Sequence, residues 1–150
     1  NPDIEDFERP LNQRGLKDAP LIAEFLTEIP FIPELIVSSP AKRAKTTAEI
    51  ISEKTGYNPN NIVFNESVYE ADADILMEVV NSTPDKVNTL LLVGHNPAIT
   101  VFCNLISDKR IDNIPTCGLA AIQMNIKSWK SVAIDCGKLI FFEYPKKAGF

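Results

Sequence analysis

The sequence is poor in the residues that most often bind metals or form disulfide bonds. It has one histidine and three cysteines in 150 residues. Cys103, Cys117 and Cys136 lie far apart and form no Cys-x-x-Cys pair, which excludes the usual thiolate zinc motifs and argues against a disulfide framework. We therefore expect a cytoplasmic protein with free thiols, no metal and no cofactor.

An excess of positive charge and long hydrophobic runs are absent as well. The formal net charge is −5, whereas a general nucleic-acid binder needs a basic face. No stretch approaches the roughly 20 apolar residues of a membrane span. A hydrophobic content of 45% supplies the core of one domain, and there is no repeat or linker. We expect a single domain over residues 1–150, a monomer or weak dimer that binds neither nucleic acid nor membrane.

Strand and helix patterns alternate along most of the chain. Helices are expected over residues 13–28, 40–55, 72–81 and 97–107, and strands over 35–37, 62–64, 90–93, 119–126, 130–134 and 138–144. Pro20 lies inside the first helical pattern and should kink that helix or delay its start. This order predicts an α/β fold with a mostly parallel sheet and an antiparallel edge.

The only histidine lies at the junction of a strand and a helix. His95 follows the apolar run Leu90–Val93, which is typical of a buried strand. Asn96 is a favourable N-cap, and Pro97 suits the first helical position. Open α/β sheets bind ligands at the carboxyl ends of their strands, and helix N-termini attract anions, so His95 is a candidate anion ligand. A lone histidine is nevertheless more often structural.

A second junction of the same design lies upstream. Ser39 is expected to be an N-cap and Pro40 the first helical residue. Lys42 and Arg43 then oppose the helix dipole, each at a cost of about 0.3–1 kcal/mol. An anion bound at that helix end would explain the choice, with Arg43 as its bidentate ligand and Lys42 as a solvated neighbour. If the two strands are parallel, Arg43 and His95 converge on one anion.

Four segments, in this order along the chain, carry a resemblance to a known family. The chain resembles the histidine phosphatase superfamily, which is phosphoglycerate mutase-like, and within it the SixA-like phosphohistidine phosphatases. The segments are Arg9–Gly15 (RPLNQRG), Ser38–Ala48 (SSPAKRAKTTA), Val93–Pro97 (VGHNP) and Thr116–Ala120 (TCGLA). The second and third are specific when they occur together.

The resemblance implies a three-layer sandwich with a mostly parallel mixed sheet around a metal-free phosphate pocket. In such enzymes a histidine attacks phosphorus, and water resolves the phosphohistidine. Arg43 would clamp the phosphoryl oxygens, and His95 would bind the phosphoryl group and stabilise charge during transfer. Arg9 would approach the rim of the pocket, or else is simply a loop cation beside Glu8.

One part of the family pattern is absent. The nucleophile belongs to an Arg-His-Gly-like motif at the end of a central first strand, upstream of the segment that matches Arg9, and His95 already fills the other histidine role. We therefore expect that the given sequence lacks its natural beginning. Residues 1–150 alone should be inactive.

The proton donor has one candidate, Glu70, which falls where larger members of the family place an acid after a strand. Asp72 is better explained as the cap of the following helix. Cys103 should pack in the core as a small hydrophobic residue rather than act as a nucleophile.

Three functions fit these features. The first is a phosphatase that removes phosphate from phosphohistidine on a signalling protein, because no long insertion between Phe64 and Thr89 builds a lid over a small metabolite. The second acts on a small phosphate ester with the same chemistry. The third is a non-catalytic phosphate-binding module, which the missing nucleophile permits.

Overall fold

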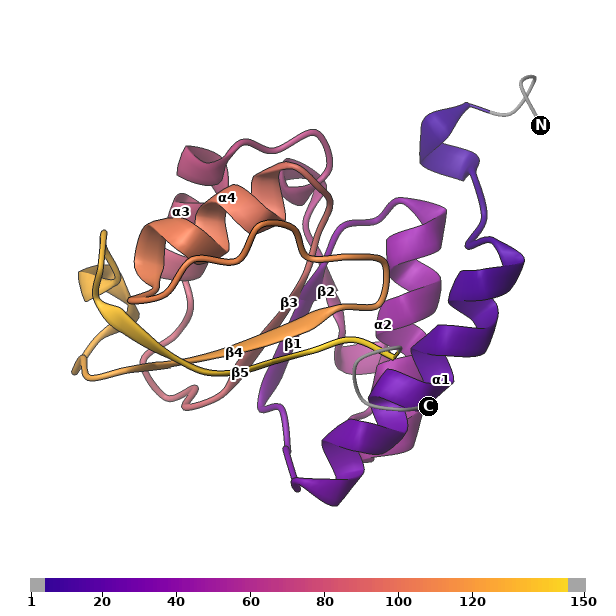
Figure 1. Ribbon diagram of the computed structural model, residues 1–150, viewed down its shortest axis with the longest axis horizontal. Helices are drawn as coiled ribbons and strands as arrows, with labels where there is room; N and C mark the ends of the chain where they lie inside the picture. Colours follow the sequence, from indigo (N-terminus) through magenta and orange to yellow (C-terminus); the bar gives the residue numbers. More distant parts are fainter. Residues whose placement is uncertain (1–4, 146–150) are drawn as a thin grey trace.

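A parallel sheet forms the centre of the fold. The computed structural model describes residues 5–145 (Figure 1). Strands β1 (Leu35–Ser38), β2 (Val63–Phe64) and β3 (Leu90–Val93) form a parallel sheet in the order β2-β1-β3. Strands β4 (Leu119–Met124) and β5 (Gly137–Glu143) pair antiparallel in a separate sheet. The alternation of strand and helix thus gives the expected α/β fold.

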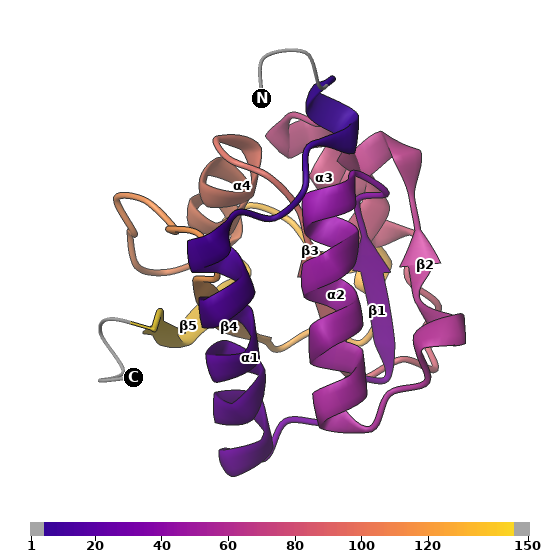
Figure 2. The ribbon, with the colours of Figure 1, turned by 90° about the vertical axis from the view of Figure 1, so that its right-hand side faces the viewer.

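Helices cover both faces of the strands. The α-helices are α1 (Gln13–Glu28), α2 (Lys42–Thr55), α3 (Ala73–Asn81) and α4 (Ala98–Ile106); the short 3₁₀ helices are η1 (Asp6–Glu8), η2 (Pro59–Asn61), η3 (Glu66–Val68) and η4 (Trp129–Ser131). Figure 2 shows α1 and α2 side by side over one face, and Figure 1 shows α3 and α4 on the other side of the strands. The result is three layers.

Alternating side chains of the central strand feed two hydrophobic cores. Ile36 packs with Leu26 and Ala48 in the core under α1 and α2. Val37 points the other way and packs with Phe102 and other residues under α3 and α4. Burial on both faces explains the apolar runs of β1 and β3, as expected of a parallel sheet with helices on both sides.

Helix α1 begins at the predicted residue and contains Pro20. The Asn12 side chain accepts a hydrogen bond from the Gly15 N–H at 2.8 Å, which starts α1 at Gln13. The helix continues across Pro20, so the predicted delay of its start was wrong. Leu16, at a position that the pattern assigns to the buried face, is 51% exposed.

The strand predicted over residues 130–134 is absent. The 3₁₀ helix η4 takes its place, because the carbonyls there have other partners. The Asn81 side-chain amide donates to the carbonyls of Trp129 and Val132 at 2.9 and 3.1 Å. The Trp129 indole donates to the Val87 carbonyl at 2.7 Å. These contacts fix the segment against the end of α3.

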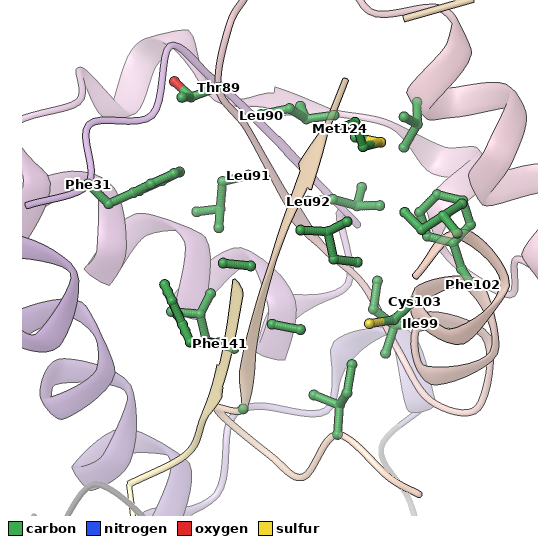
Figure 3. A pocket seen from close by; sticks show the side chains of 18 of the residues that line it. Phe31, Thr89, Leu90, Leu91, Leu92, Ile99, Phe102, Cys103, Met124 and Phe141 are labelled. Atoms are coloured by element: carbon green, nitrogen blue, oxygen red, sulfur yellow. The ribbon is translucent and has the colours of Figure 1, made fainter. Parts of the chain in front are cut away.

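The described strands do not form one continuous sheet. Among residues 5–145, β3 pairs only with β1 and β4 pairs only with β5. A cavity of about 260 Å³ lies between β3 and β4 (Figure 3). Its apolar walls include Phe31, Leu91 and Phe141 on one side and Leu92, Phe102 and Met124 on the other.

Candidate functional site

Parallel pairing brings the two predicted anion ligands together. Ser38 at the end of β1 lies beside Val93 at the end of β3, so the loops that follow leave the sheet at the same edge. Arg43 and His95 both line one cavity of about 330 Å³ at this edge. The arrangement is the one that the two strand–helix junctions predict.

The N-terminus of α2 carries two cations beside this cavity. The helix begins at Lys42, later than predicted, and its first turn contains Lys42 and Arg43 but no acid. Lys42 is exposed, whereas the Arg43 side chain is only 29% exposed. Ser39 is not the N-cap: its hydroxyl accepts from the Ala41 N–H at 3.1 Å, ahead of the helix. The free N–H groups of this turn add to the positive end of the helix.

The loop that holds His95 is fixed by a side chain rather than by a helix cap. Asn96 was predicted as the N-cap, but α4 begins at Ala98 after a cis Asn96–Pro97 peptide bond. The Asn96 amide instead donates to the Ile114 carbonyl at 2.6 Å, and its oxygen accepts from the Thr100 hydroxyl at 2.6 Å. These bonds tie the loop to the segment before β4.

His95 is half-buried and surrounded by polar and aromatic groups. Its Nε2 lies 2.8 Å from the Ser39 hydroxyl oxygen. The Tyr69 ring meets the imidazole edge to face, with 5.8 Å between ring centroids. Burial, and then the charge of Arg43, lower the pKa of His95 and so favour the neutral ring.

Asp6 is part of the site, although no motif in the sequence predicts it. Its carbonyl and its carboxylate accept from the Arg43 guanidinium at 2.8 and 3.2 Å, and its carboxylate also accepts from the Tyr69 hydroxyl at 2.7 Å. The Tyr69 hydroxyl and then Arg43 hold the pKa of Asp6 below its usual value. Phe7 packs edge to face on Tyr69, with centroids 5.1 Å apart, and helps to hold this turn beside Tyr69 and Arg43.

An oxyanion that binds Arg43 must compete with the Asp6 carboxylate. We expect Asp6→Asn to tighten the binding of inorganic phosphate about two- to five-fold, because exposed ion pairs are worth little and their loss frees the guanidinium. Isothermal titration calorimetry measures the change. Glu8→Gln removes an equal charge from the same exposed turn and should leave the affinity unchanged; equal effects of both variants would mean that Asp6 does not compete at Arg43.

The other two predicted site residues lie outside this cavity. Arg9 is exposed at the end of η1, where its charge lowers the pKa of Asp6. Glu70 is exposed beside Tyr69 and has a left-handed backbone with φ of 59°. Neither is among the described residues that line the cavity with Arg43 and His95. Asp72, in contrast, caps α3 as predicted, accepting from the Ile75 N–H at 2.9 Å.

Cys103 and Cys117 are poor nucleophiles in this structure. Cys117 lines the cavity, but burial and the charge of Asp18 raise its pKa to about 11, so its thiol is protonated at pH 7. Cys103 is buried on α4, as predicted, and burial raises its pKa as well. Among residues 5–145, no cluster of histidine, cysteine and carboxylate side chains could hold a metal ion.

Comparisons with known sequences give a family match for about half of the chain. Residues 5–78 match the model of the histidine phosphatase superfamily (branch 1). An uncharacterized chloroplastic protein of Arabidopsis thaliana is 29% identical over 85% of this chain, which spans only 62% of that protein. An uncharacterized protein of Mycobacterium tuberculosis is 27% identical over 95% of this chain and 93% of its own length. None of the helices in the described residues has the length and apolarity to cross a bilayer.

Solved structures share the fold. An Agrobacterium tumefaciens protein assigned as the phosphohistidine phosphatase SixA superposes with a TM-score of 0.78 at 25% identity, covering 97% of this chain and 89% of that one. The protein histidine phosphatase SixA complexed with tungstate superposes with a TM-score of 0.81 at 18% identity, covering 96% and 89% of the two chains. The chain therefore has the fold of the SixA phosphohistidine phosphatases, and residues 5–78 resemble the histidine phosphatase superfamily in sequence.

Proposed function

We propose that the protein is a phosphatase that acts through a phosphohistidine enzyme intermediate and removes phosphate from phosphohistidine on a signalling protein. The observation that carries this proposal is the shared cavity of Arg43 and His95, beside the N-terminus of α2. A guanidinium, an imidazole and free helix N–H groups are all donors to phosphoryl oxygens. The site therefore suits a phosphoryl group in transfer.

Each side chain has a distinct task in this mechanism. Arg43 binds two phosphoryl oxygens with its planar fork and offsets their charge. His95 donates a hydrogen bond to a third phosphoryl oxygen, and this bond strengthens as negative charge develops on the phosphoryl group during transfer. A second imidazole attacks phosphorus as the bond from phosphorus to the substrate breaks. Water then attacks the phosphohistidine and releases inorganic phosphate.

The attacking imidazole must come from outside residues 1–150, because His95 is the only histidine of the sequence. The cavity between β3 and β4 suits a strand that carries it. The carbonyls of Thr89 and Val93 accept hydrogen bonds from backbone N–H groups of β1 and of the residues next to it. Main-chain groups alternate sides along a strand, so those of Leu90 and Leu92 face the cavity and could pair with such a strand. A strand parallel to β3 would end beside Arg43 and His95.

The choice of a protein substrate rests on the short segment between Phe64 and Thr89. Between Phe64 and Thr89 the chain forms only the short η3 and the nine-residue α3. Neither element extends into a lid, and a lid is what encloses a small metabolite in a water-free site. Glu70 is the proposed proton donor in this region, although phosphoimidazole is a good leaving group that needs little protonation.

Phosphatase assays of the full-length gene product test the substrate. The expected result is faster turnover, as kcat/KM, of a phosphohistidine peptide than of small phosphate esters, and no turnover by residues 1–150 alone. A preference for the ester would instead indicate a phosphatase of small phosphate esters that uses the same mechanism. If the gene product lacked a second histidine, bound phosphate and turned over neither substrate, the protein would be a non-catalytic phosphate-binding module. Glu70→Gln should slow ester hydrolysis more than phosphohistidine hydrolysis.

A further inference from the structure

The contact between Ser39 and His95 joins the two strand–helix junctions. The Ser39 hydroxyl oxygen lies 2.8 Å from His95 Nε2, and the Ser39 side chain is fully buried. The same oxygen accepts from the Ala41 N–H at 3.1 Å. Ser38 beside it is equally buried, but its hydroxyl donates to the Ser39 carbonyl at 2.9 Å and does not meet the ring. The two serines therefore have different partners.

A count of hydrogens assigns the direction of the bond to His95. A serine hydroxyl has one proton to donate and two lone pairs to accept with. The Ala41 N–H already occupies one lone pair of Ser39. No solvent reaches the buried hydroxyl, and buried polar hydrogens nearly always have a partner. Among the recorded contacts of this hydroxyl, His95 Nε2 is the group that can accept its proton.

We propose that Ser39 is a positioning residue for His95: its hydroxyl donates to Nε2 and so holds the neutral ring in the tautomer that carries its proton on Nδ1. The Nδ1–H is then the donor that His95 offers to a phosphoryl oxygen. The tautomer is a property of the folded chain, whereas its effect on turnover rests on the proposed function.

The charged and aromatic groups around the ring are compatible with the neutral form. Arg43 on α2 opposes protonation of His95, and burial does so more strongly. Asp6 on η1 acts in the opposite direction with a smaller effect. Tyr69, after η3, presents its ring to the imidazole and directs its hydroxyl to Asp6. A proton on Nε2 would also remove the acceptor that the Ser39 hydroxyl needs.

Nitrogen-15 NMR of the imidazole tests the proposal without an activity assay. The chain has one histidine, so the ring gives one set of signals; in a longer gene product, loss of signals in His95→Gln identifies them. We expect at pH 7 a protonated Nδ1 and an unprotonated Nε2. The opposite tautomer, or a ring that is doubly protonated at pH 7, would overturn the proposal.

Two serine variants separate positioning from packing. Ser39→Ala should mix the tautomers, raise the pKa of His95 and lower kcat about ten-fold with little change in KM, whereas Ser39→Thr restores the hydroxyl and the wild-type tautomer. Ser38→Ala is the matched control, and it should leave tautomer and kcat unchanged. Equal changes in the ring signals of both alanine variants would overturn the proposal. If Ser39→Ala does not fold, the tautomers of the wild type and of Ser39→Thr still test the proposal, because both rings should carry their proton on Nδ1.

Discussion

Replacing Arg43 with alanine is expected to lower kcat/KM of the full-length gene product about a thousand-fold. The guanidinium lines the cavity with His95 and is the one described side chain there that carries a permanent positive charge. Removing such a preorganised charge from developing phosphoryl oxygens typically costs about two to three orders of magnitude in rate. Steady-state kinetics with a phosphohistidine peptide measures the loss.

Two further variants define the role of Arg43. Arg43→Lys keeps the charge but loses the planar fork, so we expect it to recover only part of the activity. Lys42→Ala removes an equal charge from the same helical turn, but Lys42 is exposed and does not line the cavity. It should keep kcat/KM within about two-fold. If Lys42→Ala and Arg43→Ala caused similar losses, a general positive potential would explain the site better than a specific clamp.

Replacing His95 with alanine should reduce kcat about a hundred- to a thousand-fold, because the phosphoryl group loses a donor that acts in the transition state. Asparagine and glutamine sharpen the test. The amide nitrogen of asparagine falls near the position of Nδ1, and that of glutamine falls near Nε2. Since Nε2 is occupied by Ser39, His95→Asn should keep more activity than His95→Gln. The reverse order would mean that Nε2 faces the phosphoryl group.

The pH dependence provides a separate check on His95. Its pKa in the folded chain is lowered by burial and by Arg43, so the unfolded chain binds more protons between the two pKa values. The contribution of His95 to stability is therefore complete above its unfolded pKa and is lost as the pH falls below that value. Denaturant midpoints measured between pH 7 and pH 5 should fall less in His95→Gln than in the wild type.

Much of the fold follows from local patterns in the sequence. The apolar run over residues 90–93 predicts a strand, and the structure has β3 there. The prediction works because β3 packs between two layers of helices, so both of its faces are apolar. The start of α1 also depends on neighbouring residues, because the Asn12 side chain caps this helix. The failure at residues 130–134 is different in kind. Asn81, about 50 residues earlier, determines that segment through tertiary hydrogen bonds.

The site shows the same division between local and distant causes. Arg43 and His95 could be predicted to converge because parallel strands place their carboxyl ends at one edge. The cap assignments of Ser39 and Asn96 failed because both side chains bond across the site instead, Ser39 to His95 and Asn96 to Ile114. Asp6 was missed since its partners Arg43 and Tyr69 are 37 and 63 residues away along the chain.

The most direct measurement is a crystal structure of the protein with bound tungstate or inorganic phosphate. If Arg43 and His95 form one oxyanion pocket, the anion will lie within hydrogen-bond distance of the Arg43 guanidinium and of His95 Nδ1, in place of the Asp6 carboxylate. An anion bound elsewhere, with Arg43 still paired to Asp6 and the His95 ring closed off from it, would contradict the account.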